Sequence, residues 1–344
     1  MKKVFLLCVF LLISITLAFP AGVLTYEILR PASDPLPKDV KTLAFVYRNY
    51  NFKADSITHF YKYNDETFVD NEDYTKLIAE SAYWGFRATV EEHYSLDTIP
   101  FVMLDETEGD SLRTIPPLTW DKVNLICAEN KSDVLVSLDD ITIFNNYETW
   151  FDGEKYNGVA DISSFHRWTV YDPLTEVYLF EEAELDSLQA FETDYYLEQL
   201  VKSRLPHREE IMKVVAFSIG EALGKKLAPY WETVYREYYD SGTREMREAA
   251  KKVREEKWDE ALQIWAEIQT NAPDKHKARA AFNMAIVHER LGLLTQALID
   301  IQVSINFYKN IKKLEKEREL AETLKEVLQR RKSEVEQLKA QNVE

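Results

Sequence analysis

The hydrophobic pattern of this 344-residue chain changes near residues 239–243, and the change divides the chain into two parts. Before it, short apolar runs bounded by proline, glycine and aspartate alternate with helical patterns, whereas after it apolar residues recur only at helical spacing. The charge changes at the same place. Residues 19–239 hold 20 Lys+Arg and 40 Asp+Glu, and residues 240–344 hold 20 and 19. The pattern predicts an α+β domain over residues 19–239, with a mixed sheet flanked by helices, followed by an all-α region.

The first 18 residues have the anatomy of a secretory signal peptide. Lys2 and Lys3 form a basic start, residues 4–18 are an uncharged and mostly apolar run, and Ala18 ends a small-residue cleavage motif. The run is shorter than the roughly 20 residues of a membrane-spanning helix, which leaves an uncleaved anchor as the alternative. Because Cys8 lies inside the run, we do not expect it to be lipidated. The segment predicts export to the periplasm or the periphery of the outer membrane.

Composition excludes several classes of protein. With 46% hydrophobic and 29% charged residues, the chain is neither wholly disordered nor a polytopic membrane protein. A net charge of −17 disfavours binding to nucleic acid, and it leaves only a peripheral membrane association open. Cleavage after Ala18 would leave Cys127 as the one cysteine, so the exported protein would have no internal disulfide. Cys127 lies in an apolar helical stretch and is expected to be a buried structural thiol.

The amino-terminal domain is expected to alternate strands with helices. The apolar runs predict strands at residues 23–29, 43–47, 101–104, 134–144, 165–171 and 176–180, and helices at residues 74–94, 119–130 and 212–234. Pro229 is expected to kink the last helix, and residues 50–73 are expected to form a loop. Asp139 and Asp140 are expected at a strand edge or bulge, with their side chains on opposite faces and in water.

The carboxy-terminal region resembles tetratricopeptide repeats. The residues that carry the resemblance are Ala249, Trp258, Ala261, Trp265 and Pro273 in a first unit, and Phe282-Asn283-Met284-Ala285, Gly292, Ala297 and Ser304 in a second. Ala261 and Ala297 are 36 residues apart, close to the repeat length of about 34 residues. The resemblance implies two helix pairs over residues 243–308. Because two repeats are too few to be stable alone, we expect them to dock on a neighbouring helix.

Residues 309–344 are predicted to end the chain as an amphipathic helix. Leu314, Ala321, Leu328 and Val335 are spaced by seven and are surrounded by charged residues. Two interpretations remain open. The helix either caps the repeats or forms a coiled-coil arm that makes a homodimer.

Two broader resemblances concern the rest of the chain. Residues 41–46, 130–136 and 168–173 resemble core segments of the α/β domain found in the curli-secretion lipoprotein and in the TolB amino-terminal domain. That resemblance implies a periplasmic scaffold or docking module. Residues 26–32 and 282–285, among others, resemble an uncharacterised family of Bacteroidota cell-envelope proteins with tetratricopeptide repeats.

The search for catalytic chemistry is negative. The six histidines show no metal-ligand spacing, and no nucleophile elbow, P-loop or dinucleotide fingerprint is present, so the sequence implies no enzyme, metal or cofactor. The alternative is a glycan-binding protein or a hydrolase with a site in the amino-terminal domain. Its carboxylates would be Asp139, Asp140, Glu148 and Asp161, and the aromatic residues of 230–239 would stack on sugars.

The leading expectation is a non-catalytic cell-envelope scaffold or adaptor that binds a protein partner through its repeats. In tetratricopeptide repeats the first helix of each pair lines the concave face, which places Arg254, Arg279, Asn283 and Arg290 on or near it. Arginine suits carboxylates and asparagine can bind a peptide backbone, so an acidic or carboxy-terminal peptide is the natural partner. Alternatively, these arginines pair with the acidic first domain.

Overall fold

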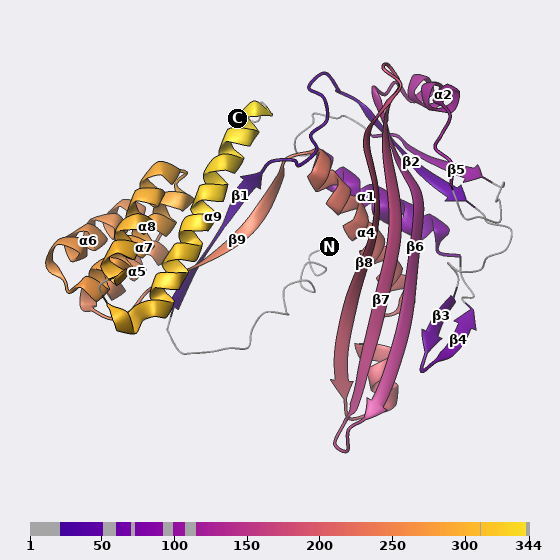
Figure 1. The fold of residues 1–344 in the computed structure, drawn as a ribbon. Helices are drawn as coiled ribbons and strands as arrows, with labels where there is room; N and C mark the ends of the chain where they lie inside the picture. Colours follow the sequence, from indigo (N-terminus) through magenta and orange to yellow (C-terminus); the bar gives the residue numbers. More distant parts are fainter. Residues whose placement is uncertain are drawn as a thin grey trace. The chain divides into compact units, whose positions relative to one another are not determined.

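A computed structural model describes residues 21–50, 60–69, 73–91, 99–106, 115–309 and 311–341, so the expected signal peptide lies outside the described residues. Contacts between residues divide the chain into two units (Figure 1). Residues 31–230 form what we call the sheet unit. The helical unit combines residues from 231 onward with the amino-terminal segment that ends at Arg30.

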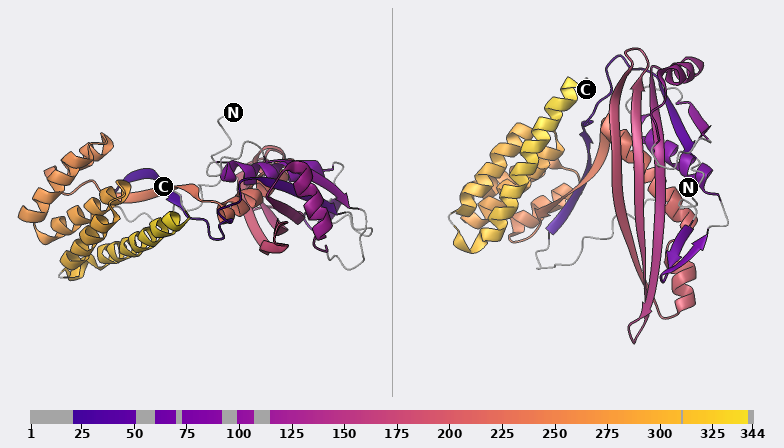
Figure 2. Two further views of the ribbon diagram at one scale, coloured as in Figure 1. Left: turned by 90° about the horizontal axis from the view of Figure 1, so that it is seen from above. Right: turned by 45° about the vertical axis from the view of Figure 1, so that its right-hand side comes forward.

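The sheet unit contains one mixed sheet of seven strands in its described part. The strands are β2 (Leu43–Tyr50), β3 (Phe60–Tyr63), β4 (Glu66–Val69), β5 (Phe101–Glu106), β6 (Val134–Phe151), β7 (Tyr156–Asp172) and β8 (Val177–Asp194). The first half of β6 pairs in parallel with β2, which pairs in parallel with β5, and its second half pairs in parallel with β3. On its other side β6 begins an antiparallel meander through β7 to β8, whose long strands run side by side in Figure 2.

Helices cover the two faces of the sheet unequally. α1 (Thr75–Val90) and α4 (Arg208–Leu227) pack together on one face, in a core that includes Phe45, Phe86 and Trp168. α2 (Trp120–Asn130) covers the opposite face near β2 and the start of β6. The residues of β2 are therefore buried on both faces, as its continuous apolar run predicts. Between β8 and α4 the chain forms the short helix α3 (Leu197–Gln199) and a single π-helical turn, η2 (Leu200–Arg204).

The helical unit contains five consecutive α-helices and a two-stranded sheet. The helices are α5 (Arg244–Arg254), α6 (Trp258–Asn271), α7 (Asp274–Arg290), α8 (Leu294–Lys309) and α9 (Glu315–Ala340), and the short turn η3 (Lys312–Leu314) precedes α9. Each helix packs against the next one in sequence, and Trp265 is fully buried among them (Figure 1). β1 (Ala21–Arg30) pairs with β9 (Tyr230–Tyr239), and we call this pair the β1–β9 ribbon.

The coarse expectation of a mixed sheet flanked by helices and followed by a helical region is confirmed. The α9 residues Ala321, Leu324, Leu328 and Leu338 are buried, and α9 packs on α8 and on β1. This packing is the capping arrangement, and it leaves no apolar stripe on α9 for a coiled-coil partner along those four positions. Cys127 is buried in α2, as expected of a structural thiol.

Three expectations for individual elements are wrong. The helix expected over residues 212–234 ends at Leu227, and residues 230–239 form a strand instead. The aromatic residues of this strand therefore lie on both sides of the β1–β9 ribbon and do not repeat along a helix. Residues 60–69, expected to lie in a loop, contain the β3–β4 hairpin. The segment that ends at Asp139 is not a solvated edge, because β6 is paired on both sides and Asp139 is buried.

The expected domain boundary near residues 239–243 also differs from the observed division. β1 and β9 belong by their contacts to the helical unit, although both precede residue 240. The sequence pattern shows where helical periodicity begins, but it does not show which unit an isolated strand joins.

Candidate functional site

The four residues predicted to bind a partner all contact the chain's own β1–β9 ribbon. Asn283 on α7 is fully buried, and its side chain accepts a hydrogen bond from the Tyr239 backbone N–H (2.8 Å) and donates one to the Tyr239 carbonyl (2.7 Å). The Arg279 guanidinium lies 4.6 Å from the centre of the Tyr239 ring and 3.5 Å from a Glu317 oxygen. Asparagine thus binds an extended backbone as predicted, but that backbone is β9.

Arg290 and Arg254 also lie near tyrosine side chains of the β1–β9 ribbon. The Arg290 guanidinium lies 5.9 Å from the Tyr26 ring of β1 and 5.8 Å from the Trp258 ring. Burial raises the pKa of the Tyr238 phenol of β9, and the nearby Arg254 charge partly opposes that rise. β9 therefore occupies the position expected for an external peptide at Asn283 and Arg279, whereas Arg254 and Arg290 are exposed.

A buried ion pair that the sequence pattern did not reveal fixes β9 to α7. Arg236 donates two hydrogen bonds to the Glu289 carboxylate, at 2.9 and 2.8 Å, and the Glu289 side chain is fully buried. Burial raises the pKa of the nearby Tyr26 phenol, and the Glu289 charge raises it further. Arg236 had been expected beyond a proline-kinked helix, so neither its strand nor its partner was predicted.

In the sheet unit, Arg48 organises a buried polar network near the carboxyl ends of β2 and β5 and beside the first half of β6. It donates to Asp139 (3.1 Å) on β6, to Glu106 (2.8 Å) on β5 and to a backbone carbonyl (2.7 Å). Thr169 also donates to Asp139, at 2.6 Å, and Lys122 contacts Glu106. Burial raises the pKa of Glu106, but hydrogen bonds from Lys122 and Arg48 outweigh it and leave the pKa below its usual range. The two acids are thus matched by two cations, as in a structural ion network.

A β-bulge changes the predicted geometry of the two adjacent aspartates. The register shifts between Leu138 and Asp140, so Asp139 is the extra residue and Asp140 lies opposite Arg167. Asp139 bonds to Thr169, two residues along β7 from Arg167 and therefore on the same face. The expectation of opposite faces is wrong, because a bulge interrupts simple alternation.

The shared face does not assemble the carboxylate cluster considered from the sequence. Asp140 pairs in register with Arg167, whereas Asp161 pairs with Asn146, six residues farther along β6, which is about 20 Å of strand. Asp161 instead accepts a hydrogen bond from Gln189, at 2.6 Å. The predicted carboxylates therefore do not converge on one substrate-sized position.

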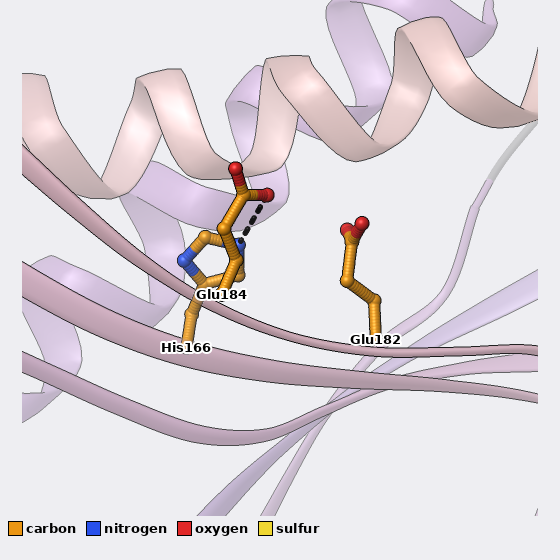
Figure 3. A group of neighbouring side chains, drawn as sticks. All are labelled: His166, Glu182 and Glu184. Carbon is orange, nitrogen blue, oxygen red and sulfur yellow. Dashed lines mark ion pairs between the residues drawn. The ribbon is translucent and has the colours of Figure 1, made fainter.

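A second cluster joins His166 on β7 to Glu182 and Glu184 on β8. Figure 3 shows the His166 imidazole and the Glu184 carboxylate facing one another, with Glu182 beside them, and the closest N–O distance is 3.9 Å. This trio could hold a metal ion by composition, but the Lys226 ammonium already lies 2.5 Å from Glu182 and 3.3 Å from Glu184. Burial lowers the pKa of His166, which keeps the imidazole neutral. The Lys226 ammonium therefore pairs with both acids in place of a metal ion.

An open pocket of about 600 Å³ lies between α2 and the β7–β8 turn. Cys127 and Ser132 line its base, and Asp39, Asp133 and Asp172 are at its sides. Burial raises the pKa of the Cys127 thiol, so it is a poor nucleophile. Asp133 is held by the Thr42 and Lys41 backbone N–H groups, at 3.0 and 2.9 Å. Neither Cys127 nor Asp133 is therefore an activated group.

Several of the most exposed apolar side chains of the sheet unit lie on β8. Leu185 is 79% exposed, Phe191 57% and Leu188 55%. The register places Leu185 opposite Phe165 and Phe191 opposite Val159, and the Phe191 and Trp150 ring centres are 6.1 Å apart. No signal in the sequence identified this surface, because strand β8 was predicted only as far as residue 180.

Comparison with known families classifies the chain without assigning it an activity. It belongs to the family described as a domain of unknown function (DUF8603), whose model matches residues 40–239. A second family, also described as a domain of unknown function (DUF6340), matches residues 247–330. A search of curated proteins finds no match.

Solved structures resemble the chain only distantly. One is a PelC dodecamer from Paraburkholderia phytofirmans, 13% identical, covering 60% of this chain and 99% of that one, with a TM-score of 0.25. Another is a neuraminyllactose-binding hemagglutinin homolog from Helicobacter pylori, 9% identical over 57% and 89% of the two chains, with a TM-score of 0.27. The protein XCC0632 from Xanthomonas campestris is 8% identical over 58% and 90%, with a TM-score of 0.25. Similarity this low says nothing about function.

Proposed function

We propose that this protein is a non-catalytic scaffold or adaptor of the cell envelope that acts by binding another protein. The observation that carries the proposal is the 18-residue edge strand β8, which exposes Leu185, Leu188 and Phe191. Exposed apolar surface of this kind is characteristic of protein-binding sites. The polar clusters of the sheet unit, by contrast, are neutralised by their own lysines and arginines.

The helical unit fits the proposal in a different way from the sequence expectation. Its consecutive helix pairs, with Ala249, Ala261 and Ala297 at buried close contacts, are consistent with tetratricopeptide-like repeats. In this proposal the repeats bind the β1–β9 ribbon of their own chain, as a stable base for the adaptor. The proposed export of the protein is supported by the signal-peptide pattern of residues 1–18. In the described part of the chain, no helix has the length and apolarity needed to cross a bilayer.

Site-specific photocrosslinking in the source cell tests the proposal. Three variants would each carry a benzophenone side chain at one exposed position. The positions are Leu185 on β8, Ile299 on α8 and Lys213 on α4, and the Lys213 variant is the matched control. We expect a discrete, protease-sensitive adduct from Leu185 and none from Lys213. Adducts from none of the positions, or adducts that resist protease and contain carbohydrate, would contradict a protein-binding adaptor and favour the glycan-binding alternative.

A further inference from the structure

β8 is an unusually long strand with only one paired edge. Among the described residues it hydrogen-bonds only to β7, so half of its backbone N–H and C=O groups have no strand partner there. Free edges of this kind pair readily with another extended chain. β8 contains no proline and no glycine, so nothing in its sequence prevents a further strand from pairing along its full length.

The side chains of β8 define what such a strand would meet. Leu185 and Phe191 lie on one face, and Leu188 lies on the other. An incoming strand would therefore find apolar contacts on both sides of the sheet. Cross-strand apolar pairs contribute to the stability of such an added strand.

The charge of β8 is entirely acidic. Residues 177–194 hold six Asp+Glu and no Lys, Arg or His. Lys226 neutralises Glu182 and Glu184, and Arg204 contacts Asp194. Glu181, Asp186 and Glu192 are exposed and form no ion pair within the described residues. Three uncompensated carboxylates therefore flank the apolar positions.

This charge argues against a second copy of the chain as the occupant. Antiparallel pairing of two β8 strands about Leu188 would place Glu184 opposite Glu192, and like charges directly opposite one another are destabilising. The net charge of −17 adds repulsion between whole molecules. A basic strand, by contrast, would gain ion pairs along the same edge.

We propose that the free edge of β8 binds an extended segment of a partner protein by strand addition, and that this segment alternates lysine or arginine with apolar residues. The inference rests on the proposed adaptor function, because it names the chemistry of the adaptor's partner. The added strand forms backbone hydrogen bonds with β8. Its basic side chains meet Asp186 and Glu192 on one face of the sheet, and its apolar side chains meet Leu185 and Phe191 on the other.

The test uses the full chain and an acetylated, amidated nine-residue peptide that alternates Lys and Val. Fluorescence anisotropy should show saturable binding that weakens as salt rises. Hydrogen exchange should show added protection of backbone amides within residues 177–194, which is the signature of a new strand. A Glu-Val peptide of the same length should not bind.

Charge-reversal variants locate the site. Converting Asp186 and Glu192 to Lys should weaken binding of the Lys-Val peptide by at least about tenfold, because two attractive contacts become repulsive. The matched control converts the exposed α9 residues Glu319 and Glu326 to Lys, and its affinity should stay within about twofold of the parent because these charges lie outside the site. If the double β8 variant melts early, Asp186→Lys alone serves as the variant.

Three results would overturn the inference: equal binding by both double variants, binding without protection of residues 177–194, or self-association that the β8 variant abolishes. The last result would make a second copy the occupant. Failure of the peptide test together with a surviving Leu185 photoadduct would reject only the basic-strand chemistry. Loss of both would reject the adaptor function itself.

Discussion

At the scale of single residues, Asp139 and Asp140 show how one inserted residue changes the chemistry of a strand. Simple alternation separates neighbouring side chains, but the bulge places both on one face. Asp139 is matched by Arg48, Ser137 and Thr169, whereas Asp140 has Arg167 as its opposed cation. Only the second carboxyl is therefore left with an unfavourable burial.

The pKa of Asp140 makes a prediction about stability and pH. Burial is the main cause that raises this pKa from 3.8 to about 6, with the Arg167 charge lowering it and the Asp139 charge adding to the rise. A carboxyl with a higher pKa in the folded state contributes stability below about pH 4 and loses it as pH rises through about 6. Asp140→Asn should therefore raise the free energy of unfolding by about 1–3 kcal/mol at pH 7.5 and leave it unchanged at pH 4.

Urea denaturation at both pH values measures the effect of Asp140→Asn. Asp186→Asn, an exposed carboxyl in the same sheet, is the control and should change stability little at either pH. A loss of stability for Asp140→Asn at pH 7.5 would mean that its attraction to Arg167 outweighs its burial.

At the scale of elements, the sequence predicted most strands and helices but not their ends or partners. The continuous apolar run of β2 was sufficient to predict that strand, because burial on both faces requires apolar residues throughout. The helical period of α1 was sufficient to predict that helix, because burial along one stripe repeats about every three to four residues. The strand β9 was read as helix because aromatic residues at positions 231, 235 and 239 fit either period. Pairing with β1, about 200 residues away, decided the outcome.

Local sequence patterns also limited how much of the candidate surfaces could be predicted. Asn283 and Arg279 were identified from a repeat pattern, which locates residues on a helix face but not what covers that face. The edge of β8 was missed because residues 181–194 alternate weakly and are mostly exposed, so they carry little hydrophobic signal. Edges and bound segments are tertiary properties, and local periodicity does not encode them.

The packing of α1 against α4 makes a prediction at this scale. The two backbones approach at Gly85 and Gly220, and a Cβ added to Gly220 would lie 1.9 Å from the Ala82 carbonyl oxygen. Alanine normally stabilises a helix by about 1 kcal/mol relative to glycine, yet here it would force the two helices apart. Gly220→Ala should therefore lower the free energy of unfolding by about 2–3 kcal/mol or more.

Thermal unfolding followed by circular dichroism measures this change, with exposed Ala222→Gly in the same helix as the reference. The reference should lose about 1 kcal/mol through helix propensity alone. Stabilisation by Gly220→Ala would contradict the close approach of the two helices.

At the scale of the whole molecule, the sheet unit is an insertion between the two strands of the ribbon. Arg30 at the end of β1 bonds to Glu232 near the start of β9, at 2.7 Å, and Gly22 lies against Tyr238 at the other end. The strands therefore run antiparallel, like a hairpin whose turn has been replaced by residues 31–230. The ends of the insertion also meet, because the Asp34 N–H donates to the Lys226 carbonyl, at 2.8 Å. Such geometry is typical of a domain inserted in a loop.

This topology predicts that the chain can be divided into two independently folded proteins. In the first, an Asn-Gly turn replaces residues 31–230 and joins β1 directly to β9, since that dipeptide favours tight hairpins. It should be helical, unfold cooperatively and keep Trp265 shielded from water. Residues 31–230 alone should form the second, a cooperative mixed α/β fold. Circular dichroism, tryptophan fluorescence and denaturant unfolding of both proteins measure the outcome.

The control for the first protein is a chain that begins at residue 231 and so lacks β1. It loses the Arg30 contacts to Glu232 and Glu334 and the hydrogen bond from Arg331 to the Leu29 carbonyl. It also loses Tyr26, whose phenol lies near Glu289. Because these groups are partly or fully buried, their loss should lower the unfolding midpoint well below that of the hairpin-joined protein. Equal midpoints would show that β1 adds nothing to the helical unit. A hairpin-joined protein that fails to unfold cooperatively would show that the helices need the sheet unit to fold.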